Sequence, residues 1–214
     1  MKKPTRKEER KLLTQGFRLI AGVDEAGRGA WAGPLVAAAV ILPAKHKIKG
    51  INDSKKLKPE QRDKLYVQIT RSALSWAVHL VHHDEIDKNG IAKANHLALQ
   101  QAVKKLKPSP DYVLIDALEV ELGNTPSQSI IKGDEKIVSI AAASIIAKVT
   151  RDQLMHGWHI LYPAYSFHIH KGYGTERHAK ALKKHGPSPI HRQSFLPIKR
   201  LIRAKSRKHA KNLN

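Results

Sequence analysis

Residues 17–42 constrain this chain more than any other segment. They read FRLIAGVDEAGRGAWAGPLVAAAVIL: an apolar run halts on Asp24 and Glu25, crosses a glycine-rich turn and resumes as a second apolar run. This pattern predicts two strands, 17–23 and 35–42, joined as a hairpin. An ionised carboxylate beside a buried strand must be hydrogen-bonded, paired or bound to a metal. The segment therefore predicts a functional site at the mouth of a sheet strand.

The charge of the chain points to a polyanionic partner. Its 214 residues include 39 Lys and Arg against 18 Asp and Glu, a formal net charge of +21 at pH 7. Nucleic acid and an anionic membrane surface both fit such a charge. The longest apolar stretches, 35–42 and 140–147, are shorter than the roughly 18 residues of a spanning helix, and the first residues, MKKPTRKEERK, lack the apolar core of a signal peptide. We therefore expect nucleic acid rather than a membrane, and a cytoplasmic location.

The absence of cysteine removes several chemistries. It excludes disulfides, thiol nucleophiles and cysteine-ligated zinc. The thirteen histidines leave a histidine metal site open, but none forms an HxxxH helical pair beside a Glu, which disfavours a zinc hydrolase. Gly27, Gly29 and Gly33 do not form a dinucleotide fingerprint, because their spacing is one residue too long and a strand follows them.

Periodicity along the chain predicts an α/β domain. Helices are expected at 59–72, 85–106 and 139–151, and further strands at 73–81 and 112–115. Strand pairs followed by alternating strands and helices indicate a mixed sheet, and the length suits one core with an appendage. We expect a basic N-terminal arm or short helix at 1–15, a catalytic domain at 16–196 and a basic tail at 197–214. The last 44 residues hold thirteen Lys or Arg and one acid, which is typical of a nucleic-acid-facing extension.

Four acids are candidate metal ligands. Asp24 and Glu25 end the first strand, Asp116 ends the strand at 112–115, and Asp134 precedes an alanine-rich helix. If the two strands are neighbours, Asp24 and Asp116 meet at one sheet edge, and the small residues at 141–143 allow Asp134 to approach. Crowded carboxylates need a cation to stay ionised, and Mg²⁺ prefers oxygen ligands and substrate phosphates. Two such ions about 4 Å apart orient an attacking water and stabilise the leaving oxygen in phosphodiester hydrolysis.

Other interpretations of these acids stay open on sequence grounds alone. Asp134 fits a helix N-cap and Asp116 fits a turn residue equally well. Adjacent residues of a regular strand point to opposite faces. Asp24 and Glu25 therefore both reach a metal only if the strand breaks there, or if Glu25 contributes its backbone carbonyl.

Several ordered segments resemble one family. They are GVDEAGRG with AGPLVAAAVIL, DSKKL, GD followed by SIAAASIIAKVTRD, YPAYSFHIHKGYGTERH, and GPSPIHRQSF. Over residues 17–196 the chain resembles the type 2 ribonucleases H, the ribonuclease HII family. Two positions depart from the usual pattern: Ala30 stands where the family has Pro, and His170 where it commonly has Asn.

The resemblance implies a ribonuclease H-like fold with a basic helical C-terminal extension. It implies hydrolysis of the RNA strand of RNA/DNA hybrids, and incision 5′ of ribonucleotides embedded in duplex DNA, giving 3′-hydroxyl and 5′-phosphate ends. We expect the enzyme to act as a monomer, and the sequence points to no particular protein partner.

The resemblance also assigns residues. It places metal-binding acids at Asp24, Glu25, Asp116 and Asp134, with Mg²⁺ or Mn²⁺ as the cofactor, and leaves Asp152 in a structural role. Recognition of the junction between ribonucleotide and deoxyribonucleotide falls to Gly27, Arg28, Gly29 and Tyr173, and the 2′-hydroxyl is the group that distinguishes RNA there. Phosphate contact falls to Lys55 and Lys56.

Plainer interpretations accompany these assignments. Tyr173 also fits an aromatic residue packed on the core, Arg28 a solvent-exposed turn residue, and the two lysines a solvated face. Two other functions remain open: a non-catalytic basic nucleic-acid-binding protein, and a different metal-dependent nuclease on a related fold.

Overall fold

A mixed sheet organises the protein. The computed structural model describes residues 3–211, with side chains for 3–204. Within that range five strands form one sheet in the order β3-β2-β1-β4-β5. Strand β1 pairs antiparallel with β2 and parallel with β4, and β4 pairs parallel with β5. The strands are β1 (Ile20–Ala26), β2 (Leu35–Ile41), β3 (Ser75–Val81), β4 (Tyr112–Asp116) and β5 (Ser127–Ile130). The predicted α/β class and mixed sheet are confirmed.

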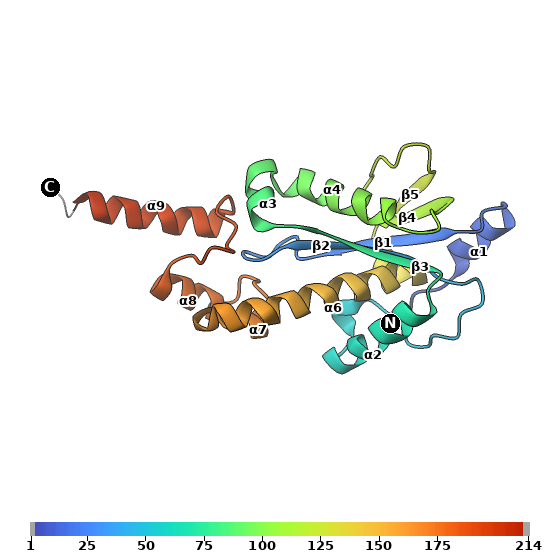
Figure 1. The fold of residues 1–214 in the computed structure, drawn as a ribbon, viewed down its shortest axis with the longest axis horizontal. Helices are drawn as coiled ribbons and strands as arrows, with labels where there is room; N and C mark the ends of the chain where they lie inside the picture. Colours follow the sequence, from blue (N-terminus) through green and yellow to red (C-terminus); the bar gives the residue numbers. More distant parts are fainter. Residues whose placement is uncertain (1–2, 212–214) are drawn as a thin grey trace. The chain divides into compact units, whose positions relative to one another are not determined.

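Helices cover both faces of this sheet. The helices are α1 (Lys7–Thr14), α2 (Pro59–Ser72), α3 (His83–Asn89), α4 (Ile91–Lys104), α5 (Gly133–Lys136), α6 (Val138–Leu161), α7 (Phe167–His170), α8 (Glu176–His185) and α9 (Leu196–Lys211), with short 3₁₀ turns at Ser54–Lys56 and Pro163–Tyr165. Figure 1 shows α4 on one face and α2 with α6 on the other. Every residue of β2 is buried, as expected for a strand that is covered on both faces.

The start of α6 lies directly against β1. A Cβ atom at Gly22 would stand 2.1 Å from the carbonyl carbon of Ser139, so only glycine permits this approach. From the other side, the buried carboxylate of Glu9 accepts hydrogen bonds from the Ser139 backbone N–H and hydroxyl, both at 3.1 Å. A carboxylate at the amino end of a helix is favourable because the helix dipole is positive there. Helix α1, within the predicted N-terminal arm, thus holds α6 in place.

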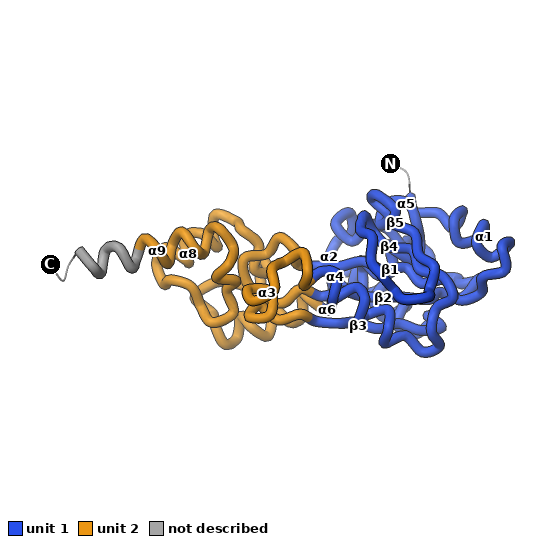
Figure 2. The backbone as a smooth tube through the Cα atoms, turned by 90° about the horizontal axis from the view of Figure 1, so that it is seen from above, with its two compact units in different colours: residues 1–26, 36–80, 95–150 blue, residues 27–35, 81–94, 151–214 orange. Residues whose placement is uncertain are grey.

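The chain divides into two compact units, drawn in separate colours in Figure 2. Unit 1 contains Met1–Ala26, Val36–Leu80 and Asn95–Thr150, and one of its cores joins Leu65 and Ile69 of α2 to the apolar face of α6. Unit 2 contains Gly27–Leu35, Val81–Ala94 and Arg151–Asn214. Its core is built around Met155, Phe167 and Ile198. The expected boundaries at residues 16 and 196 stay predictions.

Three details correct the sequence interpretation. Strand β1 continues through Ala26 instead of ending before the acids, because Asp24 and Glu25 pair with Ala38 and Ala37 of β2. The single helix expected at 85–106 is two helices, because Gly90 adopts a φ of 80° that ends α3. The helix expected at 139–151 runs on to Leu161, and the polar strand β5 was not predicted.

The C-terminal helix is partly a core element. Ile198 of α9 is fully buried, and Leu201 and Ile202 pack on the same cluster. The side chains of Lys205, Arg207, Lys208 and Lys211, which carry part of the predicted basic tail, lie outside the described residues.

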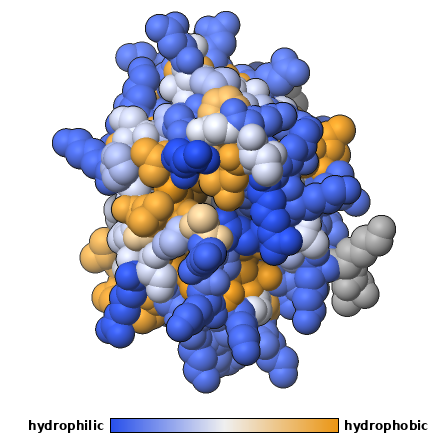
Figure 3. All heavy atoms as spheres, turned by 90° about the vertical axis from the view of Figure 1, so that its right-hand side faces the viewer, coloured by the Kyte–Doolittle hydropathy of each residue, from blue (hydrophilic) through white to orange (hydrophobic). Residues whose placement is uncertain are grey.

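Polar side chains dominate the molecular face in Figure 3, with apolar side chains in smaller areas among them. None of the helices in the described range is long and apolar enough to cross a membrane.

Candidate active site

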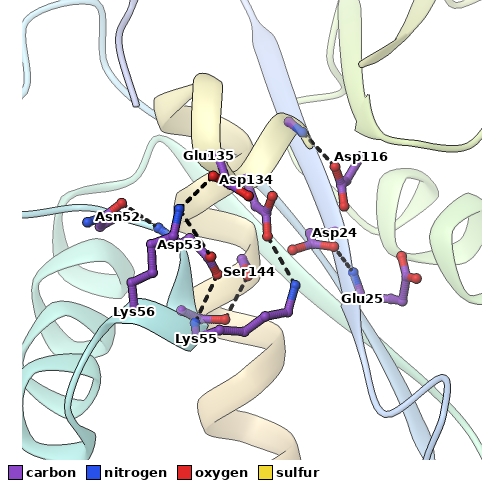
Figure 4. Close-up of polar contacts among 12 residues, drawn as sticks. Asp24, Glu25, Asn52, Asp53, Lys55, Lys56, Asp116, Asp134, Glu135 and Ser144 are labelled. Carbon is purple, nitrogen blue, oxygen red and sulfur yellow. Dashed lines mark hydrogen bonds and ion pairs between the residues drawn. The ribbon is translucent and has the colours of Figure 1, made fainter. Parts of the chain in front are cut away.

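Three aspartates from separate elements meet in unit 1. Asp24 lies in β1, Asp116 ends β4, and Asp134 lies in α5 just before α6. One carboxylate oxygen from each lies within 4.8 Å of the other two. The parallel register, in which Val23 pairs with Ile115, places Asp24 and Asp116 at the same end of neighbouring strands. Figure 4 shows Asp134 facing them from its helix. The predicted proximity of these three acids is therefore present.

Glu25 does not belong to this three-carboxylate cluster. Because β1 remains regular here, its side chain alternates to the other face, and Figure 4 draws its carboxylate apart from that of Asp134. The Glu25 backbone N–H donates to the Asp24 carboxylate at 2.7 Å. The strand break that would bring both side chains to one metal is absent from β1, so the metal-binding role of Glu25 stays a prediction.

Burial and repulsion act together on the clustered acids. Asp24 and Asp134 are each only 4% exposed. Burial, with the nearby carboxylates of Glu25 and Asp116, raises the pKa of Asp24 well above its ordinary value. Burial also raises the pKa of Asp116, although its carboxylate accepts a 2.6 Å hydrogen bond from the Gly133 N–H. The cluster therefore favours any cation that relieves its negative charge.

Lys55 and Lys56 lie beside these acids. The Lys55 ammonium is 3.2 Å from the Asp134 carboxylate, and its side chain is 78% exposed. Partial burial lowers the Lys55 pKa, but the charge and hydrogen bond of Asp134, together with the charges of Asp24 and Asp53, outweigh this effect, so the pKa lies above its ordinary value. Lys56 pairs with Glu135 at 2.6 Å. Lys55 thus pairs with one of the clustered aspartates, whereas Lys56 pairs with the next residue along α5.

The donor set fits a hard divalent cation. Three carboxylates offer oxygen ligands only, which suits Mg²⁺ or Mn²⁺ better than a soft metal. The raised pKa of Asp24 shows that its charge is incompletely compensated by the protein alone. Ser144 and the Glu25 backbone donate hydrogen bonds that orient this carboxylate.

The glycine-rich turn of residues 27–30 follows β1 and belongs to unit 2. Gly27 is buried with a φ of 95°, a conformation that favours glycine, whereas Arg28 and Gly29 are exposed. The Ala30 N–H donates to the Gly27 carbonyl at 3.2 Å. Proline, the usual family residue here, has no N–H to donate. The departure at this position therefore adds a hydrogen bond that closes the turn.

The loop that carries Tyr173 rests on buried histidines in unit 2. His178 Nδ1 donates to the Tyr173 carbonyl at 2.9 Å, since a carbonyl only accepts. His178 Nε2 must then accept from His191 Nε2, at 2.9 Å, and His191 Nδ1 accepts from the Ser188 N–H at 2.8 Å. Burial lowers the pKa of His178 to about 4 and that of His191 to about 3. Both rings are therefore neutral near pH 7 and fix the backbone at Tyr173.

His170 contributes to the same loop. Its Nε2 donates to the Tyr165 carbonyl at 2.7 Å, and its Nδ1 accepts from the Gly172 N–H at 3.2 Å. The ring stacks on His178 with centroids 4.3 Å apart. The histidine that replaces the usual asparagine is thus a buried support for the loop.

Sequence reasoning missed several buried polar residues of unit 2. Arg151, His178, His191 and Arg192 all fall inside the quoted motifs, but a lone charged residue is read as exposed. Each is at most 1% exposed. Their place within the same motifs as the candidate site residues was the available signal.

Comparison with known proteins places the chain in a family. The model of the family described as Ribonuclease HII matches residues 21–197. The chain belongs to the ribonuclease HII family. The ribonuclease HII of Desulfitobacterium hafniense strain DSM 10664 / DCB-2 is 51% identical over 196 residues, which cover 92% of this chain and 75% of that protein.

Solved structures agree with this family assignment. The crystal structure of ribonuclease H2 from Pyrococcus horikoshii OT3 matches with a TM-score of 0.73 and 28% identity, over 85% of this chain and 96% of that one. Bst-RNase HIII in complex with Mn²⁺ matches with a TM-score of 0.67 over 89% of this chain and 71% of that one; at 21% identity this likeness shows the fold alone. Both structural matches show that this chain has a ribonuclease H fold.

Proposed function

We propose that this ribonuclease HII family member is a metal-dependent endoribonuclease. It hydrolyses the RNA strand of RNA/DNA hybrids and incises 5′ of ribonucleotides embedded in duplex DNA, leaving 3′-hydroxyl and 5′-phosphate ends. The observation that carries the proposal is the cluster of Asp24, Asp116 and Asp134, whose carboxylate oxygens lie within 4.8 Å of one another. A strongly basic chain supplies the attraction for a polyanionic substrate.

In this proposal the three aspartates hold Mg²⁺ or Mn²⁺, with Glu25 as a fourth acid. Bound divalent cations supply activation of water and stabilisation of the leaving oxygen in phosphodiester hydrolysis. Asp24 and Asp116 present their carboxylates from adjacent strands, and Asp134 completes the set from α5. Lys55, whose ammonium lies 3.2 Å from the Asp134 carboxylate, is the side chain that would contact a substrate phosphate beside the aspartates.

Substrate reading is assigned to two segments of unit 2. The backbone of Gly27 and of the exposed residues Arg28 and Gly29 contacts the ribonucleotide, and Tyr173 contacts the sugar at the junction. Lys56 contacts a neighbouring phosphate. The enzyme acts as a monomer in the cytoplasm in this proposal.

A non-catalytic basic binding protein is less well supported. Such a protein needs basic side chains but gains nothing from crowded, buried carboxylates, which are costly without a cation. Asp24 and Asp134 are nevertheless nearly inaccessible in unit 1.

One cleavage assay tests the function. Labelled RNA/DNA hybrid, duplex DNA with a single ribonucleotide and all-DNA duplex are incubated with the protein and Mg²⁺ or Mn²⁺, with and without EDTA. The first two should be cut and the third left intact, and EDTA should abolish cleavage. Asp134→Asn should lower the rate by orders of magnitude while hybrid binding survives. Glu121→Gln, at an exposed acid outside the cluster, is the matched control and should cleave normally.

If Asp134→Asn cleaves at a near-normal rate, the assignment of Asp134 as a metal ligand is wrong. Cleavage of the all-DNA duplex would point to the different nuclease instead, and binding without cleavage of any substrate would favour the non-catalytic protein.

A further inference from the structure

Arg151 is an unusually buried cation. It is 0% exposed, and it and Arg192 are the two largest fully buried side chains of the described residues. Burying a guanidinium is costly unless its N–H groups are satisfied. Arg151 donates from Nε to the Pro34 carbonyl at 2.9 Å, and from its two terminal nitrogens to the carbonyls of Ala32 at 3.1 Å and Lys171 at 2.9 Å. These three acceptors are backbone oxygens, so this side chain organises loops.

The three acceptors come from the two segments to which substrate reading is assigned. Ala32 and Pro34 continue the glycine-rich turn, whereas Lys171 lies two residues before Tyr173. The Arg151 guanidinium carbon also lies 5.2 Å from the centroid of the Tyr173 ring, within the range of a cation–π contact. One side chain therefore touches the turn, the backbone of the second loop and the aromatic ring.

Further contacts tighten the same arrangement. A Cβ atom at Gly27 would lie 2.0 Å from Arg151 Nε, so the turn rests directly on the arginine side chain. The Trp31 N–H donates to the Gly172 carbonyl at 2.8 Å and joins the two segments a second time. Lys171 adopts a φ of 51°, which is unfavourable for a residue with a side chain. The hydrogen bond from Arg151 to its carbonyl helps to hold that conformation.

We propose that Arg151 is a positioning residue for selection of a single embedded ribonucleotide, because it fixes the Tyr173 ring relative to the turn at Gly27–Gly29. This inference rests on the proposed function, in which both segments read the junction. Recognition of one 2′-hydroxyl requires its contacts to be placed together to within about half an ångström. A long hybrid offers many registers, so its cleavage tolerates a looser arrangement.

The chemistry of arginine suits this role. Its planar guanidinium carries five N–H donors in a fixed fork and is weakly hydrated, so it can bridge three carbonyls in a buried site. The compact ammonium of lysine cannot satisfy the same three directions. Arg151→Lys therefore keeps the charge but removes the geometry.

The test compares two substrates in a double-mutant cycle. Arg151→Lys, Tyr173→Ala and the double variant are assayed for kcat/KM on duplex DNA with one ribonucleotide and on long hybrid. Each single variant should lower the ratio of kcat/KM on the single-ribonucleotide duplex to kcat/KM on the long hybrid by about tenfold or more. The double variant should lower it no further than Tyr173→Ala does, because Arg151 acts through that ring. The ratio is independent of the folded fraction, since one active population cuts both substrates.

Arg192→Lys is the matched control. Arg192 is equally buried and donates to the carbonyls of Arg28, in the glycine-rich turn, and of Gly33, just after it. The fold losses in the ratio caused by Arg192→Lys and by Tyr173→Ala should therefore multiply in their double variant, unlike those of Arg151→Lys and Tyr173→Ala. Arg151→Gln, which retains an amide donor, serves as the second variant if Arg151→Lys does not fold.

The outcomes separate the two proposals. Equal losses on both substrates, or multiplicative effects of Arg151→Lys and Tyr173→Ala, would overturn the positioning role while leaving junction reading by Tyr173 intact. If Tyr173→Ala alone leaves the ratio unchanged, the junction role of Tyr173 in the proposed function is wrong, and the role of Arg151 falls with it.

Discussion

The Asp24 carboxylate is suited to bind a cation, but its negative charge destabilises the folded protein when no cation is bound. The residue is 4% exposed and lies near the carboxylates of Glu25 and Asp116, so its negative charge is poorly solvated and repelled, although it accepts a hydrogen bond from the Glu25 N–H. Without a cation, the folded protein holds a proton on this group more tightly than the unfolded chain does. A folded-state pKa above the ordinary value of 3.8 means that stability is lost as the pH rises from that value through the raised pKa.

Asp24→Asn should therefore stabilise the metal-free protein at neutral pH. The amide keeps the shape and one acceptor but removes the charge, and the gain should exceed about 1 kcal/mol. The gain should shrink as the pH is lowered toward the ordinary pKa of an aspartate, because the parent carboxyl is then protonated. Urea unfolding in EDTA across that pH range measures it. A variant that is less stable than the parent at neutral pH would show that the hydrogen bonds of Asp24 outweigh the repulsion.

At the scale of elements, the site depends on how closely α6 approaches β1. Gly22 and Ser139 meet backbone to backbone, and α5 with Asp134 immediately precedes α6. The position of Asp134 is therefore set by a glycine two residues before Asp24 and by the helix that follows α5.

Gly22→Ala should separate these elements. A methyl group placed 2.1 Å from the Ser139 carbonyl carbon forces the backbones apart, so stability should fall by about 2 kcal/mol or more. Gly157→Ala in α6, where a Cβ meets no atom within 4 Å, is the control and should raise helix stability by up to about 1 kcal/mol. Chemical denaturation measures both variants. If Gly22→Ala is as stable as the parent protein, β1 and α6 can move apart at no cost in the free energy of unfolding.

Helix α9 combines a packed beginning with a basic end. Deleting residues 205–214 keeps Ile198, Leu201 and Ile202, which contact the unit 2 core, and removes four Lys or Arg. If these charges contact phosphates, the slope of log affinity against log salt should flatten by up to about 3.6, because each contact contributes about 0.9. Cleavage at saturating substrate should be unchanged. Hybrid binding measured over a series of salt concentrations gives the slope, and an unchanged slope would exclude phosphate contact by this segment.

At the scale of the whole molecule, the candidate chemistry and the candidate reading segments belong to different compact units. The three clustered aspartates lie in unit 1, and the glycine-rich turn and Tyr173 lie in unit 2. The aspartates expected to hold a cation therefore all belong to unit 1.

Mn²⁺ should raise the melting temperature of the parent protein. At a free concentration of about 100 times the dissociation constant the gain is about 2.7 kcal/mol, or roughly 5–10 °C for a chain of this size. Asp24→Asn should lose most of this shift. Arg192→Lys in unit 2 should lower the melting temperature without metal but keep the shift. Differential scanning calorimetry with Mn²⁺ and with EDTA distinguishes these cases, and a full shift in Asp24→Asn would place the cation elsewhere.

The sequence by itself determined the class of sheet, its hairpin and the candidate acids. Apolar runs of strand length around a glycine turn have few other solutions, and acids at their ends are costly enough to stand out. Tertiary structure decided what depends on contacts between distant segments. It brought Asp134 to Asp24 and kept Glu25 on the other face of an unbroken strand. It also buried Arg151 among backbone carbonyls more than a hundred residues away in the chain. Local patterns report the period of an element, whereas a buried cation is stable only once the folded chain surrounds it with acceptors.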